Sequence, residues 1–270
     1  MPETDRRFAG AIPEIYDTYF VPLIFAPYAG DLARRVAAAE PAAVLETAAG
    51  TGAVTRALAP LLRDDCRYVV TDLNPAMLDR ARSRQPADPR ITWAQADAMA
   101  LPFDDASFDV VCCQFGAMFL PDRPAGYREA RRTLRPGGRF VFNVWDRLEE
   151  NVFTEVIVAA GAAVFPDDPP DFFARIPHGY HKVEQIRADV AAAGFASVEI
   201  ETVARESVAP DPEQAATALC QGSPMRNEIE ARDPARLDEV TRRAAAALAS
   251  RFGPGPIAGK IQAHVVTALK

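Results

Sequence analysis

The stretch VLETAAGTGAVT, residues 44–55, joins a short apolar run to two glycines and then to a helix-forming segment. The apolar run predicts a buried strand, and the residues after Gly52 predict a helix. In a parallel sheet, a turn between strand and helix at the carboxyl ends of the strands is where nucleotide-like ligands bind. Glycine at 50 and 52 lets the backbone approach such a ligand without a Cβ in the way, although a tight turn alone is the alternative interpretation. The dinucleotide fingerprint G-x-G-x-x-G is not matched, because its third glycine position is Thr55.

Strand and helix patterns alternate on both sides of this stretch. Nearly continuous apolar strands between helices predict a parallel sheet covered on both faces, in an α/β fold. The expected strands are 42–47, 67–73, 91–97, 108–116 and 139–146, and the expected helices between them are 53–62, 75–84 and 126–134. Residues 12–40 are predicted helical but broken by Pro22 and Pro27. After residue 147 we expect helices at 151–165 and 182–195, a proline-rich loop between them, a strand at 197–204, two or three helices to 251 and a strand at 260–269.

The composition bounds the function. The chain has 270 residues and a formal net charge of −7, so a broad basic surface for nucleic acid is not expected. No apolar run reaches the length of a membrane span, and the N-terminus MPETDRRFAG lacks a signal-peptide pattern. The four cysteines, Cys66, Cys112, Cys113 and Cys220, form no CxxC pair. Buried reduced thiols in a cytoplasmic protein are favoured over a metal site or a disulfide.

Two carboxylates follow predicted strands. Asp72 ends the second strand, where its side chain can accept both hydroxyls of a ribose and would repel a 2′-phosphate; an N-cap for the next helix is the alternative. Asp97 ends the third strand and can accept from an adenine amine while the N–H of Ala98 donates to the ring; a turn residue is the alternative. Met77 is expected either against the adenine or in the core.

Four segments in this order resemble the successive motifs of class I S-adenosylmethionine-dependent methyltransferases, most closely the small-molecule branch that includes quinone-biosynthesis enzymes. They are VLETAAGTG, VTDLNPAMLDRAR, ADAMALPFDDASFDVV and LRPGGRFVFNVW, within residues 42–146. The family's acidic-x-Gly-x-Gly-x-Gly loop appears as Glu46-x-Ala48-x-Gly50-x-Gly52, with alanine in place of the first glycine. The resemblance implies a Rossmann-like seven-stranded sheet of order 3-2-1-4-5-7-6, in which 260–269 is an antiparallel strand beside 197–204.

The resemblance also implies the contacts of the cofactor, S-adenosyl-L-methionine, and of its product, S-adenosyl-L-homocysteine. The acid of the loop would face the methionine amino group, the loop backbone would hold the amino-acid end, and the second and third strand ends would hold the adenosine. The implied cofactor-binding residues are Glu46, Ala48, Gly50, Gly52, Asp72, Leu73, Met77, Asp97, Ala98, Gln114 and Phe115, together with Tyr19 from an N-terminal segment like the lid of such sites. Core packing is the alternative for Tyr19.

Methyl transfer from a sulfonium is an in-line displacement, which requires alignment of the reacting atoms and exclusion of water. A base is needed only when the acceptor must lose a proton. His178, in the loop FFARIPHGYH, is the candidate base, and a residue that only opens the following helix is the alternative. No metal is expected.

We therefore predict one methyltransferase domain over 1–270, with a helical lid (1–40), a cofactor-binding core (41–146) and substrate-side helices with the last two strands (147–270). The predicted partner is a small or lipophilic organic acceptor methylated on oxygen or carbon, with no nucleic acid and no membrane insertion, in a monomer or a homodimer. The segment QFGAMF after the fourth strand lacks the Pro-Pro-aromatic run of enzymes that methylate DNA amines. A non-catalytic S-adenosylmethionine-binding regulator and, less favoured, an NAD(P)-dependent oxidoreductase are the alternative functions.

Overall fold

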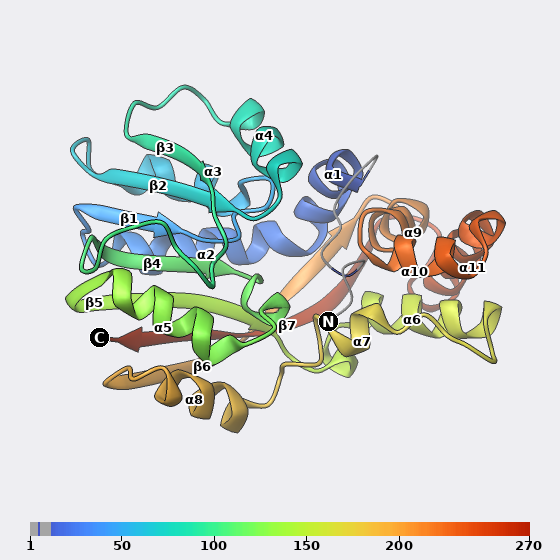
Figure 1. Ribbon diagram of the computed structural model, residues 1–270. Coiled ribbons are helices and arrows are strands. Elements are labelled where there is room, and N and C mark those ends of the chain that lie inside the picture. The colour runs from blue at the N-terminus through green and yellow to red at the C-terminus, as the bar shows by residue number, and fades with distance from the viewer. Residues whose placement is uncertain (1–4, 6–11) are drawn as a thin grey trace. The chain divides into compact units, whose positions relative to one another are not determined.

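The computed structural model describes Asp5 and residues 12–270 (Figure 1). The chain forms two compact units. We call the first the helical unit (Met1–Pro27, Asp146–Gly179 and Ala204–Gln262) and the second the sheet unit (Tyr28–Trp145, Tyr180–Val203 and Ala263–Lys270). Each unit is therefore assembled from three separate stretches of sequence. The division into lid, core and substrate side within one domain stays a prediction.

Seven strands form one sheet in the order β3-β2-β1-β4-β5-β7-β6, as the sequence predicted. Strands β1 to β5 pair in parallel, and β7 runs antiparallel to β5, with Phe142 opposite Val266. The strands are β1 (Ala43–Glu46), β2 (Arg67–Asp72), β3 (Ile91–Gln95), β4 (Phe108–Gln114), β5 (Leu134–Trp145), β6 (Ser197–Ala209) and β7 (Ile257–Leu269). The central strand β1 is buried along its whole length, which explains its continuous apolar sequence.

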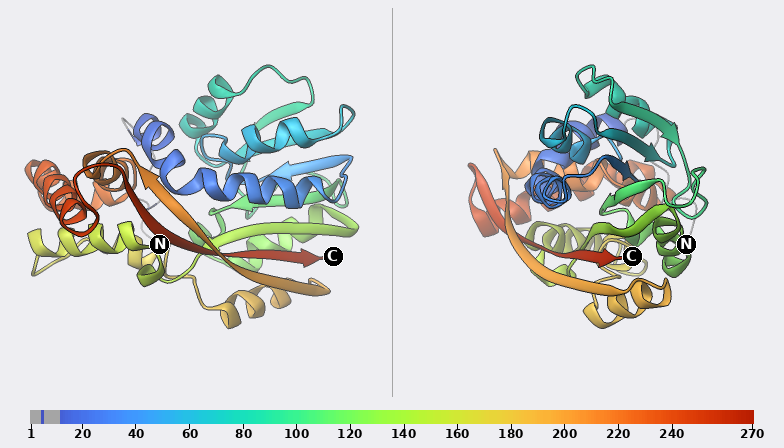
Figure 2. Two further views of the ribbon diagram at one scale, coloured as in Figure 1. Left: turned by 180° about the vertical axis from the view of Figure 1, so that it is seen from behind. Right: turned by 90° about the vertical axis from the view of Figure 1, so that its left-hand side faces the viewer.

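Helices pack on both faces of the central strands of the sheet unit (Figure 2). Val44 and Cys112 belong to a core cluster with α2 (Ala26–Ala37), α3 (Ala53–Leu58) and α4 (Pro75–Arg84). On the other face, Phe140 and Phe142 pack against Tyr127 of α5 (Arg123–Thr133), with ring centroids 5.6 and 5.1 Å apart, and α5 in turn packs on α8 (Val183–Ala192). This is the doubly covered sheet expected from the sequence.

The prediction that the prolines interrupt the N-terminal helix is wrong. Helical backbone continues through α1 (Ile12–Ile15), the π-helix η2 (Tyr16–Phe25) and α2. Pro22 lies inside η2. The wider turns of a π-helix shift its hydrogen bonds by one residue, which accommodates the missing N–H and the bulk of a proline ring without ending the helix.

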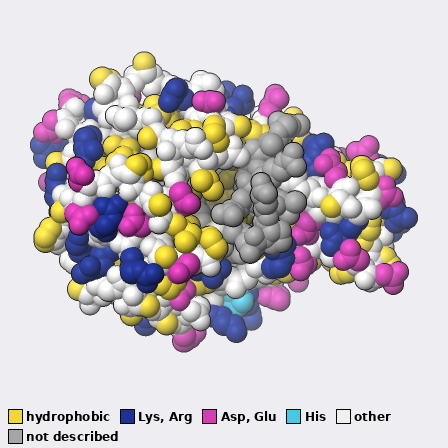
Figure 3. All heavy atoms as spheres, viewed as in Figure 1, with side chains coloured by type: hydrophobic (Ala, Val, Ile, Leu, Met, Phe, Trp, Pro, Cys, Tyr) yellow, Lys and Arg dark blue, Asp and Glu magenta, His cyan; other side chains and the backbone are white. Residues whose placement is uncertain are grey.

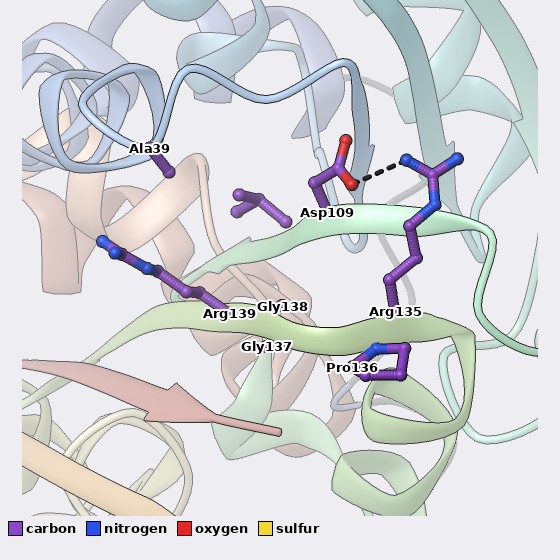
Figure 4. Close-up of a pocket in the computed structure, with 8 residues that line it drawn as sticks. Ala39, Asp109, Arg135, Pro136, Gly137, Gly138 and Arg139 are labelled. Carbon is purple, nitrogen blue, oxygen red and sulfur yellow. Dashed lines mark hydrogen bonds and ion pairs between the residues drawn. The ribbon is translucent and has the colours of Figure 1, made fainter.

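β5 begins at Leu134, earlier than the predicted 139, because the RPGG segment continues the strand with a shift of register between Phe108 and Val110 of β4. At this shift the Asp109 carboxylate accepts from the N–H groups of Ala42 and Ala43 and pairs with Arg135 at 2.6 Å. A cavity of about 170 Å³ lies here, at the amino ends of the strands (Figure 4). Its lining carries both signs of charge, and its ion pair holds the bulge together.

In the helical unit, α11 (Leu237–Phe252) packs on α6 (Val152–Val164) and α9 (Pro212–Gln221). The remaining helices of this unit are α7 (Phe172–Arg175), η5 (Leu148–Glu150), α10 (Met225–Arg232) and η6 (Pro234–Arg236), while η3 (Ala59–Leu61) and η4 (Ala117–Phe119) belong to the sheet unit. The predicted proline-rich loop thus contains one short helix, α7. Glu228 explains it, because its carboxylate accepts from the N–H groups of Asp171 and Phe172 at the start of α7.

Charges of both signs are interspersed on the face seen in Figure 3. Across the residues that the structure describes, no helix combines the length and the apolar character that a membrane span requires. The four cysteines are buried free thiols, as the sequence predicted.

Candidate functional site

The carboxyl ends of β1, β2, β3 and β4 lie at one edge of the sheet unit, because these strands are parallel neighbours. Eleven of the predicted cofactor-binding residues belong to this unit and either end these strands or follow them, namely Glu46, Ala48, Gly50, Gly52, Asp72, Leu73, Met77, Asp97, Ala98, Gln114 and Phe115. Their roles toward a cofactor stay predictions.

The loop after β1 has three residues in the left-handed region. Their φ angles are +51° at Ala48, +57° at Gly50 and +81° at Gly52. The two glycines adopt this conformation without strain, whereas an alanine adopts it at a cost. The loop is tied down by its own N–H groups, since Ala49 donates to the Thr71 carbonyl and Gly52 to the Ala49 carbonyl, both at 2.9 Å.

Asp72 connects the loop to the end of β2. Its Oδ2 accepts from the Gly50 N–H and its Oδ1 from the Asn74 N–H, both at 2.8 Å. The alternative that Asp72 caps α4 is wrong, because Asn74 is the N-cap and its side chain accepts from Ala76. Burial raises the pKa of Asp72, and the two backbone hydrogen bonds oppose this rise. Each carboxylate oxygen retains a further lone pair, so the group fits two ribose hydroxyls as well.

Glu46, the last residue of β1, is buried and held by two hydroxyl groups. Thr55 Oγ1 donates to its Oε2 at 2.7 Å, and the Tyr68 hydroxyl donates to the same oxygen. Burial raises the pKa of Glu46 to about 7, while the bonds from Tyr68 and Thr55 lower it. The two hydroxyl groups thus hold the Glu46 side chain in place, and a pKa of about 7 means that its protonated and ionised forms are both populated near neutral pH.

Glu46 should make the stability of the protein depend on pH. Because its pKa is higher in the folded chain than in the unfolded one, its stabilising contribution is complete below the unfolded value and is lost as the pH rises through about 7. We expect the free energy of unfolding of the parent to fall between about pH 5 and about pH 8. This fall should exceed that of Glu46→Gln by an amount on the order of 2–3 kcal/mol.

Urea unfolding at the two pH values measures this difference, and Glu184→Gln, at an exposed position on α8, is the charge-matched control. An equal pH dependence in Glu46→Gln and the parent would show that Glu46 is ionised without penalty in the folded protein.

The segment expected to receive the adenine presents apolar and polar groups to solvent. Leu73 is 45% exposed, and the Gln95 side-chain amide donates to its carbonyl at 3.0 Å. β3 ends at Gln95, so Asp97 lies in a turn, where its exposed carboxylate accepts from the Met99 N–H. The turn-residue interpretation of Asp97 therefore describes its local structure. Met77 is only 3% exposed and packs in the core.

At the end of β4, Gln114 is followed by Phe115, which is buried at a φ of +51°. The Phe115 ring stacks on Trp145 with centroids 3.8 Å apart, and Tyr28 meets both rings edge-on at 5.4 Å. The Phe115 N–H donates to Asn143 Oδ1 at 2.9 Å. Stacking and this hydrogen bond hold Phe115 in a conformation that a phenylalanine rarely adopts.

Tyr19 and His178 belong to the helical unit, whereas the other eleven predicted residues belong to the sheet unit. Tyr19 is 37% exposed on the π-helix η2. His178 is buried, and its Nδ1 lies 2.7 Å from the carbonyl oxygen of Asp146. A carbonyl only accepts, so Nδ1 carries the proton and Nε2 is the basic nitrogen of the neutral ring.

The sheet-unit edge fits S-adenosylmethionine on its own chemistry. It combines a loop of left-handed residues, a carboxylate with free accepting capacity at Asp72 and an exposed apolar side chain at Leu73. Within the described part of the chain, the buried Oγ1 of Thr51 in the loop has no hydrogen-bond partner, which leaves a polar atom for a ligand. The described residues contain no cluster of His, Cys, Asp and Glu that could hold a metal ion.

A sheet of order 3-2-1-4-5-7-6 with this loop at its carboxyl edge defines a class I S-adenosylmethionine-dependent methyltransferase domain. Residues 45–142 match the family described as "Methyltransferase domain", which confirms the resemblance seen in the sequence. S-adenosylmethionine is the cofactor of the class.

The curated relatives match part of the chain. Demethylmenaquinone methyltransferase of Clavibacter sepedonicus is 41% identical over 98 residues, which cover 36% of this chain and 39% of that protein. A ubiquinone/menaquinone biosynthesis C-methyltransferase of Shewanella frigidimarina is 29% identical over 177 residues, 61% of this chain and 70% of that protein. The chain thus spans about two fifths of the length of the first of these relatives.

Among solved structures, phosphoethanolamine N-methyltransferase 2 of Haemonchus contortus, in complex with phosphomonomethylethanolamine and S-adenosylhomocysteine, has a TM-score of 0.59 at 17% identity. The match covers 98% of this chain and 59% of that one. At this identity the likeness shows the fold alone.

The sequence interpretation missed the residues that hold the site from behind. Tyr68 and Thr55 hold Glu46, Asn74 caps α4, and Asn143 holds Phe115. Tyr68 carried a signal, because a tyrosine facing the core of a central strand needs a partner for its hydroxyl. The partner itself could not be found from spacing, since it lies on the neighbouring strand.

Proposed function

We propose that the protein transfers the methyl group of S-adenosylmethionine to a small or lipophilic organic acceptor. The observation that carries the proposal is the loop of left-handed residues braced by Asp72 on a sheet of methyltransferase order, within a segment that matches the methyltransferase-domain family. The names of the curated relatives support a quinone-like or other lipophilic acceptor. The NAD(P)-dependent oxidoreductase, already the less favoured alternative, loses further support, because the sheet order and the family match both favour methyl transfer.

When bound, S-adenosylmethionine supplies an electrophilic methyl carbon on a sulfonium, so the protein chiefly has to align and shield it. In this proposal Asp72 holds the ribose, Asp97 and the N–H of Ala98 read the adenine, and the loop from Ala48 to Gly52 receives the methionine end. Glu46 is the last residue of β1, shortly before this loop. Its pKa is about 7, and its ionised carboxylate would attract the ammonium group of the methionine end.

Isothermal titration calorimetry with S-adenosylhomocysteine and with NADH tests the cofactor. We expect binding of the first and none of the second. A panel of quinols, phenols and other lipophilic acceptors, assayed for release of S-adenosylhomocysteine, then tests turnover. Binding with no turnover on any acceptor favours the regulatory alternative, and absence of binding contradicts the proposal.

We further propose that His178 is the base where the acceptor must lose a proton. Its Nδ1–H is committed to the Asp146 carbonyl, which fixes the ring and leaves Nε2 as the proton acceptor. Glutamine in its place keeps the size and one hydrogen bond but cannot take the proton.

His178→Gln is expected to lower kcat by about tenfold or more while the affinity for S-adenosylhomocysteine stays unchanged. The pH–rate profile should lose its acidic limb. His181→Gln, three residues along the same loop, is the control and is expected to retain kcat. Unchanged turnover in His178→Gln would leave His178 as a residue that only shapes the loop.

We also propose the kind of partner and the location of the protein. The mixed charge on the face seen in Figure 3 supports a small-molecule partner rather than nucleic acid, and buried thiols support a cytoplasmic location. We propose that the helical unit contributes the residues that bind the acceptor; within this unit the buried ring of Phe20 packs against Tyr16 and Phe173.

A further inference from the structure

Ala48 occupies the position where the family's loop has its first glycine, and it does so at a φ of +51°. An L-residue in this region holds its Cβ close to its own carbonyl oxygen, which is why glycine is favoured there. The Ala48 methyl group also needs space among its neighbours, and the structure shows where that space is.

The room comes from Gly116, which follows Phe115 after β4. A Cβ built on Gly116 would lie 2.4 Å from the Ala48 Cβ and 2.8 Å from Cys113 Sγ. Gly116 itself has a φ of −96° and a ψ of −30°, a conformation open to any residue. The backbone therefore does not require glycine at 116; the neighbouring methyl group does.

We propose that Gly116 is a positioning residue for the loop from Ala48 to Gly52. The Ala48 methyl group occupies the space that a side chain at 116 would need, and its contact with Gly116 fixes the path of the loop beside the end of β4. The inference rests on the proposed function. A side chain at 116 would push Ala48 away from β4, and Ala48 is joined through Ala49 to Gly50, whose N–H is held by Asp72. Displacement of Ala48 would thus distort the part of the loop that receives the methionine end, while Leu73 and Asp97, which follow other strands, stay in place.

The packing beneath the pair is tight. Ala48, Cys113 and Gly116 line a cavity of only about 20 Å³, whose lining also includes Tyr127 and Phe140. A cavity of this size holds about one water molecule. It offers little space into which an added methyl group could move, so the loop has to move instead.

A double-mutant cycle tests the pair, with Ala48→Gly, Gly116→Ala and both together, each made in a Cys113→Ala background to remove the second collision. The affinities for S-adenosylhomocysteine and for free adenosine are measured by calorimetry. We expect Gly116→Ala to lower the affinity for S-adenosylhomocysteine by about tenfold and the affinity for adenosine by less than about twofold. Ala48→Gly alone should stay within about threefold of the background, and the double variant should recover to within about threefold.

Gly126→Ala is the matched control, because its added Cβ would meet only the Cδ1 end of the flexible Leu120 side chain at the same cavity. It is expected to keep both affinities. Three results would overturn the inference: an unchanged affinity in Gly116→Ala, a double variant no better than Gly116→Ala, or equal losses for the two ligands, which would indicate general damage. If the parent and the background bind neither ligand, it is the proposed function that fails.

Discussion

Replacing Gly50 with valine is expected to weaken the binding of S-adenosylhomocysteine by at least about 100-fold. Gly50 has a φ of +57°, a region that a β-branched residue occupies only under strain. Its N–H also donates to Asp72 Oδ2, so any change of the backbone angle to relieve the strain would break the bond that braces the loop. Bulk at this position would in addition occupy the space in which the loop backbone meets the ligand.

Gly137→Val separates strain from ligand contact. Gly137 has a φ of +77°, and a Cβ built on it would meet nothing within 4 Å. It lies in the RPGG segment, at the amino ends of the strands and therefore at the sheet edge opposite the loop. The control should lose stability to a similar degree, measured as the midpoint of thermal unfolding, and keep its affinity. Equal affinities in the two variants would show that the loop does not approach the ligand.

Removing the Asp72 carboxylate is also expected to weaken ligand binding strongly. Asp72→Ala leaves the N–H groups of Gly50 and Asn74 without their acceptor and removes the proposed contact with the ribose. We expect the affinity for S-adenosylhomocysteine to fall by about 1–3 kcal/mol, which is about 5- to 150-fold. The free energy of unfolding should fall as well, because two backbone donors at the end of β2 lose their partner.

Asp79→Ala is the charge-matched control, since Asp79 is exposed on α4 only seven residues away. Comparison of ribose-containing with 2′-deoxyribose-containing ligand adds a second test. The parent should discriminate against the deoxy compound, and Asp72→Ala should not. Retained discrimination in Asp72→Ala would assign the ribose to another residue and leave Asp72 as a brace of the loop.

The sequence predicted the sheet because its signals are local. Each central strand is a continuous apolar run, and α4 was predicted with the bounds that it has, since Pro75 at its start and a run of helix-forming residues define it. The order of the strands came from the family resemblance and is confirmed. The placement of Asp72 and Gly50 at one edge followed from the rule that parallel strands end on the same side.

What the sequence did not predict depends on contacts between distant residues. The continuation of the N-terminal helix past Pro22 depends on π-type turns that no propensity indicates, and the early start of β5 depends on Asp109 of the neighbouring strand. Gly116 was predicted only as the last residue of the strand 108–116, and no sequence pattern indicates that the Ala48 methyl group lies against it.

The two units of this protein are interleaved along the chain, with β6 continuing past Val203 and β7 beginning before Ala263. An exchange of the helical unit for that of another protein would therefore need three donor fragments, and one of them, Ala204–Gln262, would be joined within a strand at both of its ends. A single crossover between two genes cannot exchange the whole helical unit, because the unit is encoded by three separate stretches of the gene.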